Sequence, residues 1–157
     1  MTRFKELYDA GAVTRFHTKR TIHTQTIAEH SWGVAMILTR ICNPRAELLR
    51  AALTHDLAES VTGDTPATAK WLHEPLKQAL DIMEIAVNRH LGIDTELSKH
   101  ELELLKWADM LELILYCESE VDMGNTKMEG IVRTGIAYLD ARVPPTPEAS
   151  ALLESLK

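Results

Sequence analysis

Apolar residues recur at intervals of three and four along most of this chain, which is the period of an amphipathic α-helix. In the clearest stretch the apolar positions are Ile27, Val34, Leu38 and Ile41, and the pattern ends at Pro44. Few windows alternate with the period of two that a half-buried strand requires. The pattern predicts an all-α protein with helices over residues 2–10, 26–43, 44–59, 74–90, 99–121 and 126–141.

The segments between these helices carry turn and loop signals. Residues 11–25 have no period and are rich in Thr, His and basic side chains, so we expect a loop. Gly92 is placed to cap the helix before it. With 157 residues and no internal repeat, we expect a single domain over 1–157, with its core in 13–141 and a Pro-rich tail over 142–157.

Composition and charge exclude several classes of protein. The chain is 45% hydrophobic and 25% charged, which is typical of a globular domain. A net charge of −6 disfavours binding to the backbone of a nucleic acid. The apolar runs are too short to span a bilayer, and the first residues do not resemble a signal peptide. Cys42 and Cys117 lie in apolar helical patterns, so we expect reduced thiols in a cytoplasmic protein.

Polar residues interrupt the apolar stripes at a few positions. His30 falls on the stripe of the helix predicted from residue 26, and Asp109 falls on the stripe of the long helix. Asp56 continues the stripe of the helix predicted over 44–59, with His55 beside it. Asp is among the residues least often buried unless paired, and an unpaired buried carboxylate is costly. These positions therefore need a compensating positive charge.

A divalent cation would supply that charge. Two neutral imidazoles and two carboxylates carry a charge of −2, and this mixture of nitrogen and oxygen ligands suits Zn, Co, Mn or Fe. Each residue alone also has an ordinary explanation, since a core histidine is usually hydrogen-bonded and a buried Asp often joins two helices. The spacing by itself leaves both interpretations open.

The order of these residues resembles the H…HD…D signature of HD-domain metal-dependent phosphohydrolases. The surrounding blocks are similar to those of bacterial 5′-deoxynucleotidases, and they are Ala28-Glu29-His30-Ser31, His55-Asp56-Leu57-Ala58-Glu59, Thr62-Gly63-Asp64-Thr65-Pro66 and Lys106-Trp107-Ala108-Asp109. The chain also resembles the compact phage dATP triphosphohydrolases, which share this scaffold and small size. The resemblance extends from about Val13 to Tyr116. It implies a bundle of about five to six helices that holds one divalent ion through His30, His55, Asp56 and Asp109.

Glu59 is the candidate catalytic residue. It follows His55 by four positions and Asp56 by three, which would place it on the same face of the predicted helix. In the resembled deoxynucleotidases the glutamate of the HDxxE motif is the candidate acid and base, and Glu59 occupies that position. An ordinary solvated glutamate is the alternative.

Residues 14–23 form a basic segment in an acidic chain. They contain three fixed positive charges and no acidic residue, which suits an anionic substrate, although most such clusters are only solvated. The resemblance implies that Arg15 contacts phosphate and that Phe16 stacks against the sugar. The familiar deoxynucleotidase has Trp where this chain has Phe16.

Further residues are candidates for contact with the substrate. The resemblance places Asp64 at the 3′-hydroxyl of a deoxyribose, although turn chemistry alone also explains an Asp after Gly63. Lys19, Arg20 and Lys70 are candidates for phosphate contacts, with solvated side chains as the alternative.

Together these features predict an enzyme that hydrolyses 5′-phosphate from 2′-deoxynucleotides, either monophosphates or triphosphates. The alternative is a protein that uses the same pocket to sense nucleotides without turnover, although Glu59 would then have no use. Hydrolysis of cyclic dinucleotides or nucleic acids is disfavoured because there is one set of ligands. We also expect a homo-oligomer, since the long helix is apolar over more than one stripe; a central position in the bundle would explain the same pattern.

Overall fold

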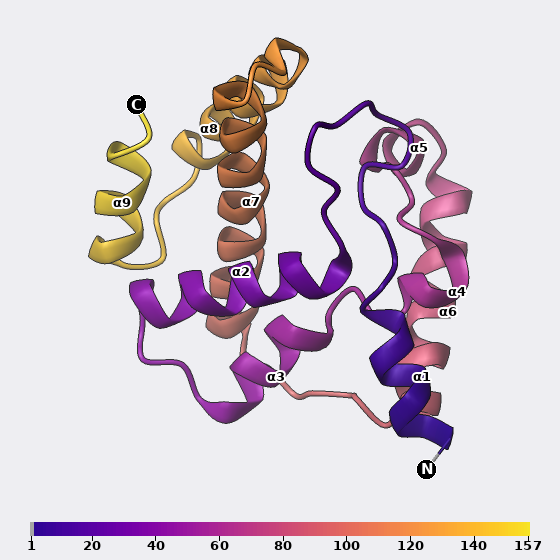
Figure 1. The fold of residues 1–157 in the computed structure, drawn as a ribbon. Coiled ribbons are helices and arrows are strands. Elements are labelled where there is room, and N and C mark those ends of the chain that lie inside the picture. The colour runs from indigo at the N-terminus through magenta and orange to yellow at the C-terminus, as the bar shows by residue number, and fades with distance from the viewer. Residues whose placement is uncertain (1) are drawn as a thin grey trace. The chain divides into compact units, whose positions relative to one another are not determined.

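The computed structural model describes residues 2–157, and every regular element in this part of the chain is a helix (Figure 1). This confirms the all-α prediction. The helices are α1 (Thr2–Ala10), α2 (Ile27–Ile41), α3 (Ala46–Thr54), α4 (Glu59–Thr62), α5 (Ala67–Leu72), α6 (Glu74–Leu91), α7 (Lys99–Asp122), the short 3₁₀ helix η1 (Thr126–Met128), α8 (Glu129–Asp140) and α9 (Pro147–Glu154).

The chain folds into two compact units. The first contains the residues up to Ser31 together with Thr54–Asp94, and the second contains Trp32–Leu53 together with Thr95–Lys157. The expectation of one domain over 1–157 stays a prediction. In the described part of the chain no helix combines the length and the apolar character needed to cross a bilayer.

The first unit is built on mutual packing of α1, α4 and α6, with α5 against α6. Its buried core consists of Ala10, Ile27, Leu57, Leu91 and Ile93. Gly92 ends α6 with φ +70°, a left-handed conformation that glycine adopts without steric cost, and this confirms the predicted cap.

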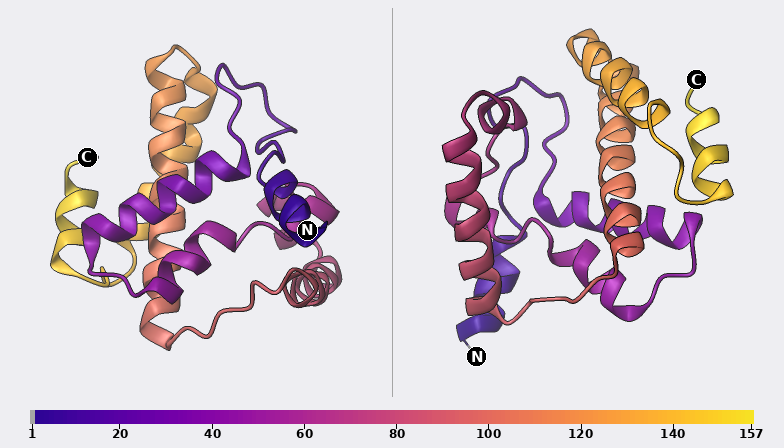
Figure 2. Two further views of the ribbon diagram at one scale, coloured as in Figure 1. Left: turned by 60° about the horizontal axis from the view of Figure 1, so that its bottom comes forward. Right: turned by 180° about the vertical axis from the view of Figure 1, so that it is seen from behind.

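The second unit is organised around α7, with α8 running antiparallel beside it (Figure 2). A complete capping box begins α7: the Ser98 side chain accepts from the Glu101 N–H, and the Glu101 carboxylate accepts from the Ser98 N–H. Leu111 and Ile114 of α7 are fully buried in the core of this unit. Packing within the chain therefore explains why α7 carries apolar residues on more than one stripe.

The C-terminal segment contributes to the same core. The predicted Pro-rich tail contains α9, and its Ala149 and Leu153 are buried. Thr146 caps this helix by accepting from the Ala149 N–H, and its hydroxyl donates to the Ile41 carbonyl at 2.8 Å. Of the prolines in this segment, Pro147 begins a helix, since it is the first residue of α9.

The structure differs most from the sequence prediction between residues 54 and 62. The continuous helix predicted over 44–59 is wrong, because α3 ends at Thr54 and α4 begins at Glu59. Between them the N–H of Leu57 donates to the Thr54 carbonyl and that of Glu59 to the Asp56 carbonyl, which are i to i+3 bonds of a tight turn. Asp56 therefore lies on a turn and does not continue a helical stripe.

The contact between α7 and α8 predicts opposite effects for two glycines of α8. A Cβ added at Gly135 would stand 2.7 Å from Ile114 Cγ1, whereas one added at Gly130 meets nothing within 4 Å. Ile114 is fully buried and stiff at χ1, so it cannot move aside cheaply. Gly135→Ala should destabilise the protein by about 1–3 kcal/mol despite its better helix propensity. Urea unfolding measures the change.

Gly130→Ala is the matched control, and its higher helix propensity should leave stability unchanged or raise it by up to ~1 kcal/mol. Equal stability of the two variants would contradict the close packing of α7 on α8.

Candidate metal centre

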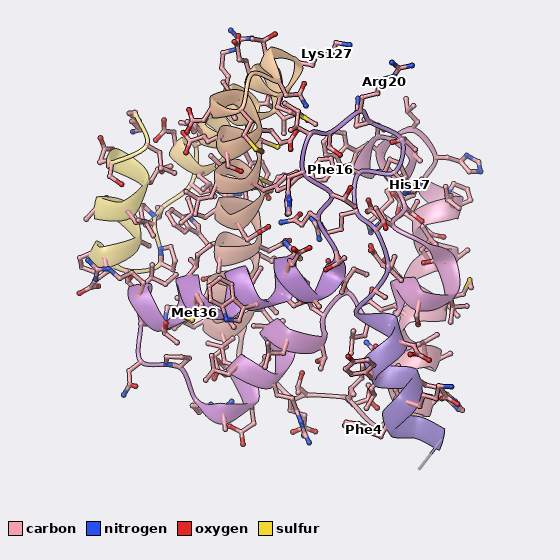
Figure 3. All side chains as sticks on the ribbon, viewed as in Figure 1. Phe4, Phe16, His17, Arg20, Met36 and Lys127 are labelled. Carbon is pink, nitrogen blue, oxygen red and sulfur yellow. The ribbon has the colours of Figure 1, made fainter. Side chains whose placement is uncertain are left out.

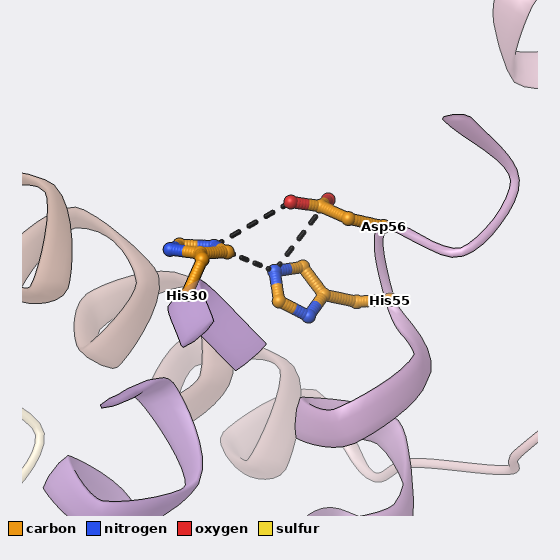
Figure 4. Close-up of side chains that lie close together, drawn as sticks. All are labelled: His30, His55 and Asp56. Atoms are coloured by element: carbon orange, nitrogen blue, oxygen red, sulfur yellow. Dashed lines mark hydrogen bonds and ion pairs between the residues drawn. The ribbon is translucent and has the colours of Figure 1, made fainter. Parts of the chain in front are cut away.

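His30, His55 and Asp56 converge on one point in the first unit (Figure 4). The Nε2 atoms of the two histidines are 3.2 Å apart. Asp56 Oδ2 is 3.4 Å from His30 Nε2, and Asp56 Oδ1 is 3.5 Å from His55 Nε2. His30 is fully buried, whereas the side chains of His55 and Asp56 are mostly buried. Three ligating groups from two distant segments therefore share one small volume.

The start of α2 sets the position of His30. The Thr26 hydroxyl accepts from the Glu29 N–H at 3.3 Å, and the Glu29 carboxylate accepts from the Thr26 N–H at 2.7 Å. This capping box fixes where the helix begins, one turn before His30. The bond from the Thr26 N–H also lowers the pKa of Glu29.

The turn after α3 sets the positions of His55 and Asp56. Leu57 and Ala58 within this turn are buried, and Leu57 belongs to the same apolar cluster as Ile27 at the start of α2. The burial of Leu57 and Ala58 anchors the turn that carries His55 and Asp56, and both side chains face His30 (Figure 4).

The separations of these atoms fit a divalent ion. Nitrogen and oxygen ligands lie about 2.0–2.2 Å from zinc, so two adjacent ligands of one ion in octahedral or tetrahedral arrangement are about 2.8–3.6 Å apart. The observed separations of 3.2, 3.4 and 3.5 Å, the last two measured to different oxygens of Asp56, fall within this range. Two imidazoles and one carboxylate are also a common protein ligand set for catalytic zinc, which keeps a fourth position open. The residues present therefore fit the metal that the sequence predicts.

Asp109 lies on α7, in the second unit. It is partly buried. Its membership of the ligand set stays a prediction.

The basic segment of residues 14–23, called the basic loop below, is bonded to this centre through Arg15. At the base of the loop, Thr14 and Thr26 form an isolated antiparallel bridge. Arg15 Nη1 donates to Asp56 Oδ2 at 2.7 Å, across 41 residues of sequence. The Arg15 side chain is largely buried, and its Nε atom has no hydrogen-bond partner among the described residues. The guanidinium therefore lies beside the candidate ligands, and its Nε–H can donate to a further group.

Phe16, the next residue, is bonded to a second carboxylate. Its backbone N–H donates to Asp64 Oδ2 at 2.7 Å. The same oxygen lies 3.9 Å from His17 Nδ1. The structure thus brings Phe16 and Asp64 together, as two residues of one site would require.

Glu59 begins α4 and comes close to the carboxylates of the site. Burial, the largest cause, and the charges of Asp56 and Asp64 together raise the pKa of Glu59 to about 8, against a smaller lowering by Arg15 and Lys70. Its Oε2 atom is buried and has no hydrogen-bond partner among the described residues. The sequence identified this residue on a wrong premise, because Glu59 reaches the site from the start of a new helix.

The other predicted basic residues differ in position. Lys70 lies on α5, and its charge acts on Glu59. Lys19 and Arg20 are exposed on the basic loop, and the Arg20 side chain extends outward from its tip (Figure 3).

One acidic residue near the site was missed by the sequence analysis. Glu84 on α6 is exposed at the surface but partly desolvated, which raises its pKa, and the charges of Asp56 and Asp81 raise it further. No sequence spacing relates Glu84 to the HD pair, His55 and Asp56, so only the packing of α6 could have revealed that Glu84 lies near the site.

The chain belongs to the YfbR-like 5′-deoxynucleotidase family, whose model, described as "5′-deoxynucleotidase YfbR-like", matches residues 3–94. This confirms the resemblance and makes the protein a hydrolase. The 5′-deoxynucleotidase YfbR of Salmonella typhi is 27% identical over 149 residues, which cover 79% of this chain and 75% of the relative. That of Photorhabdus temperata is 26% identical over 150 residues, covering 79% and 76%.

Solved structures share the fold. The HD phosphohydrolase DatZ of cyanophage S-2L, bound to dA and one catalytic Zn²⁺ ion, is 24% identical with a TM-score of 0.69, covering 96% of this chain and 91% of that one. A protein from Pyrococcus horikoshii is 22% identical with a TM-score of 0.76, covering 99% and 96%. An HD-domain phosphohydrolase from Listeria innocua is 22% identical with a TM-score of 0.72, covering 98% and 85%.

The convergence of the three ligands predicts that His55→Ala weakens metal binding strongly while the helical content stays intact. Losing one of three protein ligands removes a metal bond and leaves an incomplete site. Metal content after dialysis, measured by elemental analysis beside circular dichroism, tests this. The exposed His90, which forms an ion pair with Glu6 on the surface, provides the control His90→Ala. Full metal occupancy in His55→Ala would contradict the assignment.

The raised pKa of Glu59 predicts a pH-dependent cost to stability in metal-free protein. The unfolded chain releases the Glu59 proton near the ordinary value of 4.5, whereas the folded protein retains it up to about 8. Stability therefore falls as pH rises between these values, because the folded state binds the additional proton. Glu59→Gln removes the titration, so its stability relative to wild type should increase from pH 5 to pH 8. Urea unfolding with a chelator present measures this difference; a constant difference would contradict the buried, protonated carboxyl.

Proposed function

We propose that this protein hydrolyses the 5′-phosphate ester of 2′-deoxynucleoside monophosphates, using one divalent ion held by His30, His55, Asp56 and Asp109. The observation that carries the proposal is the convergence of two imidazoles and a carboxylate within 3.5 Å, beside a buried guanidinium. Zn, Co and Mn suit this ligand set. The family to which the chain belongs and the zinc of the cyanophage relative support the same chemistry.

A bound divalent ion supplies charge that polarises a phosphoryl oxygen and lowers the pKa of a water molecule. Arg15 binds and orients the phosphate. It remains bonded to Asp56 through Nη1 while its buried Nε–H is directed to the anion. A guanidinium can present two parallel N–H groups to phosphate oxygens, so it fixes orientation as well as charge.

Glu59 serves as the general acid. With a pKa of about 8 in the metal-free protein, it carries a proton at neutral pH. Its buried Oε2, without a partner among the described residues, donates that proton to the 5′-oxygen as the ester bond breaks.

The loop and the turn after α4 recognise the rest of the nucleotide. Phe16 packs against the 2′-carbon of the sugar, and Asp64 accepts from the 3′-hydroxyl. Lys70 contributes positive charge near the phosphate. Lys19 and Arg20 at the loop tip attract the anion from solution.

A panel of nucleotides with Mg, Mn, Co and Zn tests the proposal through phosphate release. We expect 2′-deoxynucleoside monophosphates to be the best substrates. An apolar wall excludes an added hydroxyl by roughly 10²-fold, whereas a buried acceptor rejects an analogue that lacks its donor more strongly. The 2′,3′-dideoxynucleotides should therefore be poorer substrates than ribonucleotides. Release of tripolyphosphate from triphosphates would instead indicate a triphosphohydrolase, and nucleotide binding without turnover would indicate a sensor.

Removing the acid should slow turnover without removing the metal. Glu59→Ala is expected to retain metal and bind nucleotide, with kcat lower by about 10²–10⁴-fold. Steady-state kinetics beside metal analysis measures both. Glu96→Ala, an exposed position, is the matched control. Wild-type turnover in Glu59→Ala would remove this residue from the mechanism.

Asp109 is tested in the same way as a ligand. Asp109→Ala should lose the metal while the helical content remains, because one carboxylate of the set is removed. Full occupancy by elemental analysis would limit the ligand set to the first unit.

We further propose that the protein acts in the cytoplasm as a homo-oligomer. Cys42 and Cys117 form no disulfide, which fits a reducing compartment.

The exposed Ile82 and Ile85 of α6 offer apolar surface for a second copy. Light scattering at micromolar concentration should give a mass above 17.6 kDa, and Ile82→Lys should lower it whereas Val143→Lys should not. A monomeric wild type would refute association.

A further inference from the structure

Phe16 has an unusual backbone conformation for a bulky residue. Its φ is +55°, in the left-handed region, and it is the one residue other than glycine with positive φ in the described part of the chain. A Cβ atom makes this conformation unfavourable, so it persists where the surroundings hold it in place. Such strained positions gather at functional sites.

The Asp64 carboxylate anchors the Phe16 amide from outside the loop, and the Lys19 N–H donates to the Phe16 carbonyl from within it. Asp64 Oδ2 accepts the Phe16 N–H at 2.7 Å from 48 residues away. A bond from an N–H to an ionised carboxylate is stronger than one to a neutral acceptor. The position of Asp64 is itself set by α4, because the N–H of the preceding Gly63 donates to the Glu59 carbonyl at 2.7 Å.

The left-handed backbone of Phe16 sets the positions of the Arg15 and Phe16 side chains relative to each other. Arg15 and Phe16 are consecutive, and each is bonded to a carboxylate of the segment that carries the HD pair: Arg15 to Asp56 and Phe16 to Asp64. Figure 3 shows Phe16 and His17 on this loop. A Phe16 that relaxed to negative φ would rotate the peptide and move its ring relative to the Arg15 guanidinium.

We propose that Asp64 is a positioning residue, which selects the sugar through Phe16 by holding the Phe16 backbone in its left-handed conformation. This rests on the proposed function for the identity of the ligand. Asp64 has two oxygens, and Oδ2 is committed to the loop, so any contact of the carboxylate with the 3′-hydroxyl is additional to this role.

The test compares Asp64→Ala, Asp64→Asn, Phe16→Ala and the double variant Asp64→Ala/Phe16→Ala. Calorimetry in a Glu59→Ala background, which slows turnover of the nucleotide, gives the dissociation constants of 2′-deoxyadenosine 5′-monophosphate, its 3′-deoxy analogue and adenosine 5′-monophosphate with the metal-loaded protein. Hydrogen exchange of the Phe16 amide is followed without ligand. Asp94→Ala, an exposed position in the same unit, is the control.

In wild type we expect the deoxynucleotide to bind more tightly than the ribonucleotide by about 10–10²-fold. Asp64→Ala should reduce this ratio as far as Phe16→Ala does, and the double variant should reduce it no further. Asp64→Asn retains a carbonyl oxygen that accepts the Phe16 N–H, so it should keep most of the ratio. The Phe16 amide should exchange at least ~10-fold faster in Asp64→Ala than in wild type or Asp64→Asn.

The proposal would be overturned by an unchanged sugar ratio in Asp64→Ala, by a further loss in the double variant, or by unchanged exchange of the Phe16 amide. A loss confined to discrimination of the 3′-hydroxyl would mean that Asp64 only contacts substrate. Neither binding nor exchange requires turnover. Selective binding without hydrolysis would therefore refute the proposed enzyme activity and leave the role of Asp64 standing, whereas equal binding of both sugars would refute both the selectivity and that role.

Discussion

The crowding of His30, His55 and Asp56 is the constraint on which the rest of the site depends. Two imidazole nitrogens 3.2 Å apart, one on a fully buried side chain, cannot both be protonated without severe repulsion. A divalent cation satisfies both nitrogens and the carboxylate together. The chain holds these groups in place beforehand, through a capping box at the start of α2 and a buried turn after α3.

Two carboxylates link the metal centre to the basic loop and to the candidate acid. Asp56 accepts from Arg15, and Asp64 accepts from the Phe16 backbone. The same two charges raise the pKa of Glu59 above the value that burial alone would give. A change at either aspartate should therefore affect phosphate binding, the loop and the proton on Glu59 together, because these groups interact within one partly buried region.

Helical periodicity predicted the long helices well. It failed at the turn after Thr54, which carries the candidate ligands His55 and Asp56. The predicted helices over 74–90 and 99–121 correspond closely to α6 and α7 because their apolar stripes and caps agree. The segment 44–59 has the same period, yet the chain leaves the helix after Thr54. There, burial of Leu57 and the convergence of the HD pair with His30 override local helix propensity.

The sequence by itself determined the fold class, the chemical types of the candidate ligands and their order along the chain. These features are local, since a helical period and an HDxxE block are read within a few turns of one segment. Only the tertiary structure decided that Arg15 is bonded to Asp56, that Phe16 adopts positive φ and that Glu59 is buried without a partner among the described residues. Each depends on contact between groups 41 to 48 residues apart, or on burial by other helices, and neither leaves a pattern in the residues nearby.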